Sequence, residues 1–420
     1  MLLAALVGIS CSSTSTSIFS KKTPHEKYEE KLEDNGLQKT PEGRQWLAAS
    51  EAALMDPQLI QLPYSHAGIF PKDKPRALGL KFIAKRGEKL TFTLDKNLSS
   101  HFVVYAELYK QDGEDADLLH AADTASSEFE FTINEMGTYV LRLQPELFRT
   151  GTYSLSISVG PSLSFPVAGN KGNVGSFWGA DREGGKRSHE GIDIFAPKRT
   201  PAIAAADGYV TGVKEGGIGG KTVWLRPINQ NITLYYAHLD EQLVKEGQFV
   251  KKGETIGLVG NTGNAKTTPP HLHFGIYGFG GAVDPFPFVN KRIKTAPLVS
   301  HKKMSDFLRL VKAHKSVEAV TKANTLLVPV AVNSKGYIAE LPDGRMIQTP
   351  FASVQSTIQP IKKTKVIALA AVYNAPDKNS SSTLTIQPGS SVSVLGYFNE
   401  FAFVKSGERE GWVLEKDLKG

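Results

Sequence analysis

The chain has 420 residues, of which 40% are hydrophobic and 22% are charged, which allows several cores and suggests roughly two to four domains. No apolar run of about 18 residues occurs, which argues against a membrane-spanning helix. The net charge of +7 favours contact with an anionic polymer, such as nucleic acid, an acidic lipid surface or the bacterial wall, and charge alone does not choose among them.

The first ten residues form a short apolar stretch that ends at Cys11, the only cysteine, and a Ser/Thr-rich stretch follows. This pattern resembles a lipoprotein signal peptide, in which the lipidated cysteine becomes the first mature residue. Lipidation would explain a single cysteine in a chain that enters an oxidising compartment. The stretch lacks a preceding Lys or Arg and has Gly8 where such signals usually have Leu. A plain secretory signal with an unrelated cysteine is the alternative.

Residues 12–60 are predicted to form a tether, because residues 12–40 are polar and sustain neither a helical nor a strand period. A short helix is expected over residues 44–55, where apolar residues recur at roughly helical spacing before Pro57.

Residues 61–160 contain short alternating runs separated by turn residues, such as Leu90-Thr91-Phe92-Thr93-Leu94 and Tyr139-Val140-Leu141-Arg142-Leu143. Strands at this spacing predict an antiparallel β-sandwich.

Four of the ten histidines lie between residues 189 and 273. On a strand, side chains at i and i+2, or at i and i+4, share a face. His271 and His273 can therefore point the same way, and so can His189 and Asp193. Zinc accepts imidazole nitrogen and carboxylate oxygen, and a catalytic zinc site usually has three protein ligands and one open position. His189, Asp193 and one histidine of the pair would fill this set, and two histidines would remain for proton transfer.

The surrounding sequence makes this combination specific. The stretches His189–Pro197, Ala205–Val210, Tyr236–Leu239, Gly247–Gly257, Gly260–Gly263 and Pro270–Gly275 together resemble the lysostaphin-type (LytM-like) zinc metallopeptidases of bacterial cell walls. The resemblance covers roughly residues 165–290, within a domain placed at 161–292, and implies an antiparallel β-sheet groove. It also implies that His189, Asp193 and His273 bind Zn²⁺ and that His238 and His271 are the catalytic pair. We assign His271 as general base and His238 as oxyanion stabiliser, although these two roles could be exchanged.

Residues 291–322 carry nine Lys or Arg residues against two acidic residues. With a partial helical period over 304–320, this favours a basic helical linker at 293–323, which is either a solvated helix face or a wall-binding patch. Residues 324–420 again show short strands and end in Gly411-Trp412-Val413. They predict one or two small barrels and resemble bacterial Src-homology-3-like domains that bind cell-wall peptides. For Trp412, core packing is the alternative to ligand stacking.

The expected fold class is therefore mainly β and multidomain: a β-sandwich, a LytM-like antiparallel sheet domain and small C-terminal barrels. The expected function is that of a zinc endopeptidase that hydrolyses peptide stems or cross-links of peptidoglycan, as a lipoprotein anchored in the bacterial envelope. One alternative is a non-catalytic envelope lipoprotein that binds peptidoglycan or activates an amidase. Another is a structural envelope or adhesion protein without metal. Nucleic-acid binding is not expected, because no recognised motif supports it.

Overall fold

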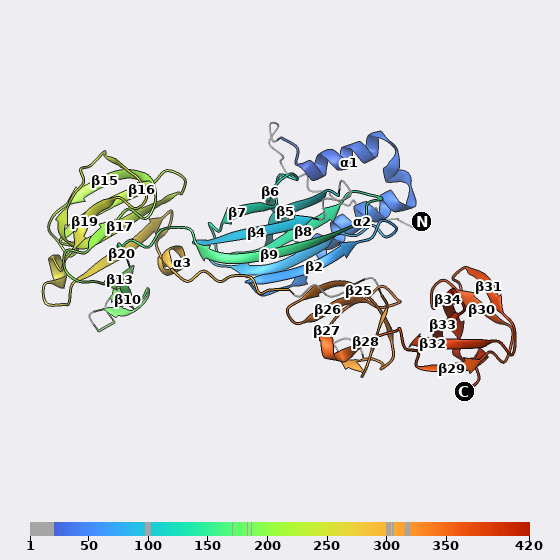
Figure 1. The fold of residues 1–420 in the computed structure, drawn as a ribbon. Helices are drawn as coiled ribbons and strands as arrows, with labels where there is room; N and C mark the ends of the chain where they lie inside the picture. The colour runs from blue at the N-terminus through green and yellow to red at the C-terminus, as the bar shows by residue number, and fades with distance from the viewer. Residues whose placement is uncertain are drawn as a thin grey trace, which may run out of the picture.

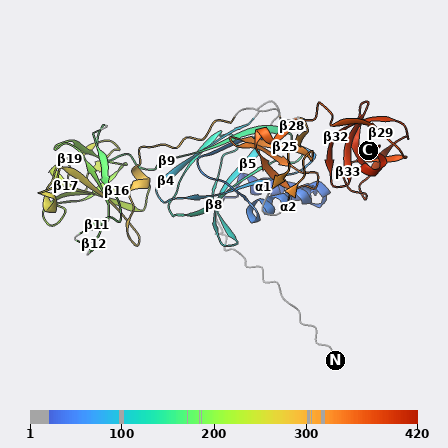
Figure 2. The ribbon, with the colours of Figure 1, turned by 90° about the horizontal axis from the view of Figure 1, so that it is seen from below.

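The computed structural model describes residues 21–96, 102–169, 171–182, 184–185, 187–299, 304, 306–315 and 320–420. The expected signal peptide and Cys11 lie outside the described residues. The chain is mainly β, as predicted. Its parts lie in a row, with residues 173–289 at one end, the sheets of residues 58–161 in the middle and residues 362–417 at the other end (Figure 1); the view from below shows the same order (Figure 2). Among the described residues, no helix has the length and apolar character needed to cross a membrane.

Two helices precede the sheets, α1 (Pro24–Asp34) and α2 (Pro41–Met55), with a 3-10 turn, η1 (Leu37–Lys39), between them. Thr23 and Glu26 form a capping box that starts α1. Leu32 and Trp46 are buried and pack with Leu147. The tether predicted for residues 12–60 is therefore wrong over these helices. Only a few apolar side chains, spread over two short helices, attach this polar segment to the neighbouring sheet. These few residues do not make a sustained helical period in the sequence, so α1 was not predicted. The expected helix at 44–55 lies within α2.

The middle of the molecule consists of two sheets that enclose one apolar core. The first sheet has the order β1-β3-β8-β5-β6 and the second contains β2-β9-β4-β7. The strands of the two sheets are β1 (Gln58–Leu59), β2 (Tyr64–Phe70), β3 (Leu78–Ala84), β4 (Glu88–Lys96), β5 (Val104–Asp112), β6 (Asp115–Ala121), β7 (Glu128–Thr132), β8 (Gly137–Pro145) and β9 (Gly151–Pro161). In β9 the buried residues alternate with exposed or half-buried ones, as in a strand with one face on the core.

The second of these sheets continues into a later part of the chain. Strand β2 pairs with β25, with His66 opposite Asn333, so that β25, β26 and β27 extend the sheet to the order β27-β26-β25-β2-β9-β4-β7. Lys74 and Arg76 both form ion pairs with Glu340 of β26. The first C-terminal unit is therefore attached through backbone hydrogen bonds and buried charge. Its strands are β25 (Leu326–Asn333), β26 (Gly336–Glu340), β27 (Met346–Thr349) and β28 (Val354–Ser356), with η4 (Phe351–Ser353) between the last two.

The basic linker does not form the predicted helix in the part that the structure describes. Strand β22 (Leu308–Leu310) pairs with β25 and β28, and β23 (His314–Lys315) pairs with β24 (Val320–Thr321). Leu308 and Leu310 are both buried in the core of this unit. Their spacing of two residues is a strand period, and the charged residues around them obscured it.

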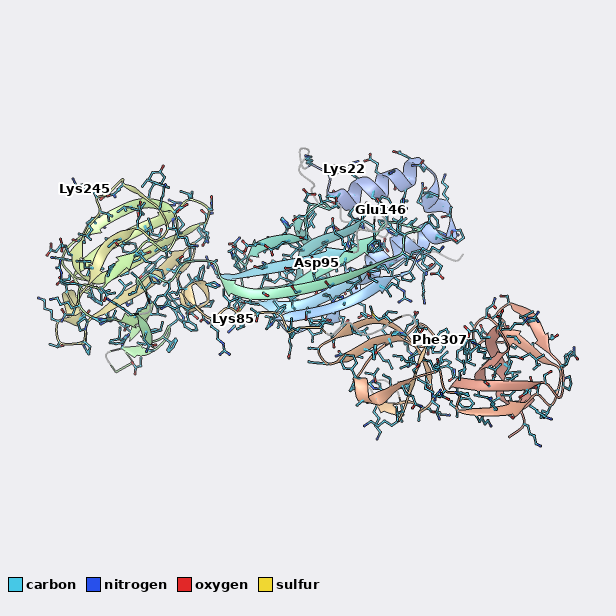
Figure 3. All side chains as sticks on the ribbon, in the orientation of Figure 1. Lys22, Lys85, Asp95, Glu146, Lys245 and Phe307 are labelled. Carbon is cyan, nitrogen blue, oxygen red and sulfur yellow. The ribbon has the colours of Figure 1, made fainter. Side chains whose placement is uncertain are left out.

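The last unit is a six-stranded sheet with the order β29-β32-β33-β34-β30-β31. Phe307, labelled in Figure 3, joins it to the preceding unit, because its ring centroid lies 5.2 Å from that of Phe403. Trp412 is buried in the core that this sheet shares with the preceding unit. This is the core packing that was the alternative to ligand stacking. The elements are β29 (Lys362–Lys365), β30 (Ala370–Tyr373), β31 (Ser382–Ile386), β32 (Ser391–Phe398), β33 (Phe401–Ser406), β34 (Arg409–Leu414) and η5 (Glu415–Asp417).

The glycine-rich segment forms its own antiparallel sheet around a separate apolar core. The path of the sheet is β10-β13-β20-β17-β16-β15-β18, with β19 bridging β14 and β17. The elements are β10 (Asn173–Ser176), β11 (Asp181–Arg182), β12 (Arg187–Ser188), β13 (Ile192–Phe195), β14 (Pro201–Ile203), β15 (Gly208–Lys214), β16 (Lys221–Pro227), β17 (Ile232–Gln242), β18 (Phe249–Val250), β19 (Thr255–Val259), η3 (Gly263–Ala265), β20 (His271–Gly278), β21 (Gly281–Val283) and α3 (Phe286–Val289).

Candidate metal centre

Three of the predicted ligands meet because of the register between β13 and β20. Asp193 lies directly opposite His273 in this antiparallel pair, so the two side chains share a face of the sheet. His189 comes before β13, and its backbone is held there by two hydrogen bonds: its N–H donates to Ala180 O over 2.9 Å, and its carbonyl accepts from Gly179 N over 3.0 Å.

The three side chains present one ligand atom each in a tight triangle. His189 Nε2 lies 3.1 Å from Asp193 Oδ1, His273 Nδ1 lies 3.0 Å from the same oxygen, and the two nitrogens are 3.1 Å apart. His189 and Asp193 are buried. These are the residues assigned as metal ligands from the sequence, and the structure brings all three together.

This arrangement fits zinc. Ligand atoms about 2.0–2.1 Å from a tetrahedral ion lie roughly 3.3 Å from one another, close to the observed separations. The imidazole of His189 donates from Nδ1 to the carbonyl oxygen of Phe177 over 2.9 Å, which turns its Nε2 towards a carboxylate oxygen of Asp193. An imidazole nitrogen and a carboxylate oxygen this close share either a proton or a metal ion, and imidazole with carboxylate is a donor set that zinc favours.

The electrostatics of Asp193 agree with a permanently ionised ligand. Burial by itself raises the pKa of this carboxyl group, but the hydrogen bonds and charge interactions with His189 and His273 outweigh burial and hold the pKa well below its usual range. Asp193 is therefore a carboxylate at neutral pH. For His273, burial lowers the pKa despite the hydrogen bond to Asp193, which favours the neutral imidazole that a metal requires.

The two remaining histidines lie beside the triangle. The ring centroid of His238 is 5.0 Å from that of His271 and 5.9 Å from that of His273. His271 Nε2 lies 3.9 Å from Asp193 Oδ1. Both side chains are buried, at 7% and 6% exposure, so these imidazoles lie in a largely desolvated site. All five residues singled out from the sequence thus form one constellation.

Each of these two imidazoles is fixed in one tautomer by a backbone carbonyl. His238 Nδ1 lies 2.9 Å from Thr262 O, and His271 Nδ1 lies 2.9 Å from Pro269 O. Because a carbonyl oxygen only accepts, both Nδ1 atoms donate, and in the neutral form of each ring Nε2 carries the lone pair. Burial, reinforced by repulsion from His271 and His273, lowers the pKa of His238 to about 4. His238 is therefore neutral at pH 7 and is able to accept a proton.

A β-bulge, which the sequence did not reveal, directs His238. Val223 pairs with Tyr236 and Lys221 pairs with Leu239, so β17 has one residue more than β16 between these pairs. The extra residue lets Tyr236 and Leu239 both reach the core, and His238 adopts a positive φ of 61°. Such bulges commonly re-aim a side chain next to a site.

Two residues beside the site received no role from sequence reasoning. Thr262 supplies the carbonyl that orients His238, and Arg182 donates to Asp193 Oδ2 over 2.5 Å. A single arginine in a charged turn and a threonine beside a glycine are common in any sequence. Only the fold shows what they touch.

Comparison with known proteins finds a described family that matches the residues around this site. Residues 187–285 match the model of Peptidase family M23. The chain is 44% identical over 88 residues to the peptidoglycan DD-endopeptidase ShyC of Vibrio cholerae, a match that covers 21% of this chain and 20% of that protein. It is 40% identical over 124 residues to the L-Ala--D-Glu endopeptidase of Bacillus subtilis, which covers 27% of this chain and 38% of that protein.

Among solved structures, the catalytic domain of lysostaphin from Staphylococcus simulans is 32% identical, with 28% of this chain and 90% of that chain covered and a TM-score of 0.25. The chain spans less than two fifths of the length of the two curated relatives above, so the similarity concerns one domain.

Proposed function

We propose that this chain, which contains a Peptidase family M23 domain over residues 187–285, is a zinc-dependent endopeptidase that hydrolyses peptide bonds of peptidoglycan. One observation carries the proposal: three ligand atoms within 3.1 Å of one another lie beside two further imidazoles with free Nε2 atoms. A structural metal site is usually closed by four protein ligands, whereas three ligands and adjacent bases are typical of hydrolytic zinc sites.

The residues divide the work as follows. His189, Asp193 and His273 hold the zinc ion, which when bound polarises a carbonyl group and lowers the pKa of water at its open position. His271 accepts a proton from the attacking water at Nε2 and passes it to the leaving amine. His238 faces the same space from β17. We assign it to stabilise the negative charge on the carbonyl oxygen of the scissile bond; this role requires a proton at Nε2, which the free, neutral imidazole does not carry and would take up as that charge develops.

The division between His238 and His271 is part of the proposal. Both histidines have the same tautomer and a free Nε2 atom, so the roles of base and oxyanion stabiliser are open to exchange. Separate pH profiles for the His238→Ala and His271→Ala variants would distinguish them, because loss of the base removes the acidic limb of the profile for kcat/KM.

The substrate follows from chemistry and from the relatives. The names of two matched proteins specify endopeptidases, one of peptidoglycan and one of an L-Ala--D-Glu bond. A net charge of +7 suits an anionic wall polymer. Peptide stems or cross-links of peptidoglycan are therefore the proposed substrate class, and the bond cleaved within them is left open.

Anchoring and wall binding are further parts of the proposal. The apolar start that ends at Cys11 supports a lipid anchor that holds the enzyme in the bacterial envelope. The six-stranded C-terminal sheet lies at the opposite end of the molecule from the metal centre (Figures 1 and 2). We assign to it a Src-homology-3-like, wall-binding role, which would raise the local concentration of substrate without taking part in the chemistry.

The experiment uses purified protein lacking residues 1–11, incubated with purified peptidoglycan with and without a chelator. Muropeptides are resolved by mass spectrometry, with His271→Ala alongside. Chelator-sensitive release of cleaved peptides that is lost in the variant supports the proposal and identifies the bond. Bound zinc without cleavage by the wild type would instead favour the second candidate, a peptidoglycan-binding or amidase-activating envelope protein. The presence of all five site residues speaks against that candidate.

A further inference from the structure

The two oxygens of the Asp193 carboxylate have different partners. Oδ1 belongs to the ligand triangle, 3.1 Å from His189 Nε2 and 3.0 Å from His273 Nδ1. Oδ2 accepts a charged hydrogen bond from Arg182 Nη2 over 2.5 Å. The side chain of Asp193 is 9% exposed and that of Arg182 is 36% exposed, so the pair is half sheltered from water. One oxygen thus faces the metal position and the other faces a guanidinium.

Arg182 also reaches the neighbourhood of a second ligand. The same Nη2 atom donates to Ser176 Oγ over 3.0 Å, and Ser176 Oγ lies 3.4 Å from His189 Nδ1. The guanidinium therefore links the end of β10 to Asp193, beside the imidazole of His189. These contacts connect two of the three ligands through one side chain.

The position of Arg182 is set by a small hairpin. Strands β11 and β12 pair with Arg182 opposite Arg187 and Asp181 opposite Ser188, and the hairpin leads directly into His189. The backbone hydrogen bonds from Gly179 N to His189 O and from His189 N to Ala180 O close this loop next to the metal position. Arg182 is thus placed by the same segment that places the first ligand.

We propose that Arg182 is a positioning residue of the metal centre, which holds Asp193 Oδ2 so that only Oδ1 faces the zinc ion. The inference rests on the proposed zinc site. A carboxylate with one free oxygen can rotate and bind a metal through both oxygens, which would fill the position needed by water or substrate. A guanidinium fixed on Oδ2 prevents that rotation and keeps the ligand singly bound. Groups that orient a ligand in this way typically contribute about 10–100-fold to metal affinity.

The test compares Arg182→Gln, Arg182→Lys and Arg226→Gln with the wild type. Arg226 is exposed, lies at the far end of β16 and loses the same charge, so it is the matched control. Zinc dissociation constants are measured by competition with a chromophoric chelator, and the melting temperature of the metal-free proteins reports folding. We expect about 10–100-fold weaker zinc binding by Arg182→Gln, partial recovery in Arg182→Lys and no change in Arg226→Gln, with metal-free melting temperatures unchanged.

A spectroscopic measurement separates positioning from general stability. In cobalt-substituted protein, a second oxygen of Asp193 entering the coordination sphere would weaken the visible absorption bands, and we expect this in Arg182→Gln only. Equal zinc affinity and equal spectra in wild type and Arg182→Gln would overturn the inference. So would tighter zinc binding by the variant, because Arg182 would then restrain the metal site. If wild type binds zinc as expected but cleaves no peptidoglycan, the proposed function fails while the affinity difference still supports the role of Arg182.

Discussion

The imidazole of His238 is oriented by the backbone of Thr262, whose carbonyl oxygen accepts from His238 Nδ1 over 2.9 Å. The hydroxyl group of Thr262 donates to Leu239 O over 2.8 Å and accepts from Lys221 N over 2.9 Å. One threonine therefore binds both strands of the bulge that carries His238, β17 through Leu239 and β16 through Lys221. This network explains how a residue with φ of 61° keeps a fixed direction.

Replacement of Thr262 by Val should lower kcat while leaving zinc affinity unchanged. Val removes the hydroxyl group and leaves Lys221 N and Leu239 O without this partner, which costs roughly 1–3 kcal/mol and loosens the bulge around His238. Thr262→Ser keeps the hydroxyl group and should retain most activity. Steady-state kinetics on a soluble peptide substrate, with zinc content measured in parallel, check this. Equal rates for the Val and Ser variants would show that the hydroxyl group does not position His238.

Zinc removal should destabilise the domain that contains β13 and β20. Without the ion, only a proton can lie between His189 Nε2 and Asp193 Oδ1, which are 3.1 Å apart. At free zinc 100 times its dissociation constant, binding stabilises the folded domain by about 2.7 kcal/mol. Calorimetry with chelator, then with zinc restored, should show a reversible fall in the melting temperature. His273→Ala should melt at the same temperature with and without chelator, and a wild type insensitive to chelator would argue against the metal site.

The metal centre was predictable from the sequence because its chemistry depends on rare residues in short motifs. His271 and His273 both lie on β20, where a spacing of two residues places their side chains on one face. His189 comes before β13, so its place beside Asp193 followed from the family resemblance rather than from strand spacing. The bulge at His238 was not predictable, because an extra residue in one strand appears only when its partner strand is known. Arg182 was missed for a related reason: its role comes from a hairpin that folds back onto β13.

The N-terminal helices and the linker show how sparse apolar residues mislead pattern reading. Leu32 and Trp46 are 2% and 1% exposed, although the segment around them is polar enough to resemble a tether. Leu308 and Leu310 make a three-residue strand inside a basic run. In both cases the partner surface, which the local sequence does not contain, decides the structure. The long-range pairing of β2 with β25 belongs to the same class.

Glu107→Gln should destabilise the contact between the N-terminal helices and the first sheet. Glu107 pairs with Arg142 over 2.5 Å, and both side chains are less than 10% exposed. Thr23, at the start of α1, donates to Glu107 over 2.9 Å, and Arg142 donates to Ser50 of α2 over 2.7 Å. Removal of one charge leaves a buried guanidinium uncompensated, which costs about 3–5 kcal/mol.

Urea denaturation would measure the loss of unfolding free energy in Glu107→Gln, and limited proteolysis would show whether the N-terminal helices detach from the first sheet. The double variant Glu107→Leu, Arg142→Met removes both charges and should recover most of the stability, because apolar replacements of a buried ion pair are often nearly neutral. If Glu107→Gln unfolds at the wild-type urea concentration, the ion pair does not hold the helices.

Acidification should destabilise the chain through His66, which is 1% exposed on β2. Its Nε2 lies 2.9 Å from Tyr153 Oη, and among the described residues its Nδ1 has no hydrogen-bond partner. Burial lowers its pKa from 6.5 to about 4. Because the unfolded chain takes up the proton first, this stability is complete above pH 6.5 and is lost as the pH falls towards 4, by roughly 3 kcal/mol in all. His66→Gln should show a correspondingly smaller loss of unfolding free energy between pH 7 and pH 4, and parallel curves for the two proteins would contradict the assignment.

Gly191→Ala should disable the metal centre although Ala is only one methyl group larger. A Cβ atom at this position would lie 2.6 Å from His273 Cε1, 2.7 Å from His273 Nε2 and 2.8 Å from Phe274 O, all well inside van der Waals contact. Because the backbone carbonyl of Phe274 belongs to β20 and yields little, the imidazole of His273 has to move away, and the ligand triangle opens. We expect zinc affinity to fall by at least about 10-fold, the scale on which a disturbed ligand shell acts.

Gly212→Ala is the control in the same sheet. The atom nearest to its new Cβ would be 3.4 Å away, so this variant should bind zinc as the wild type does. Equal zinc affinity in both variants would mean that His273 has room to shift without leaving the metal.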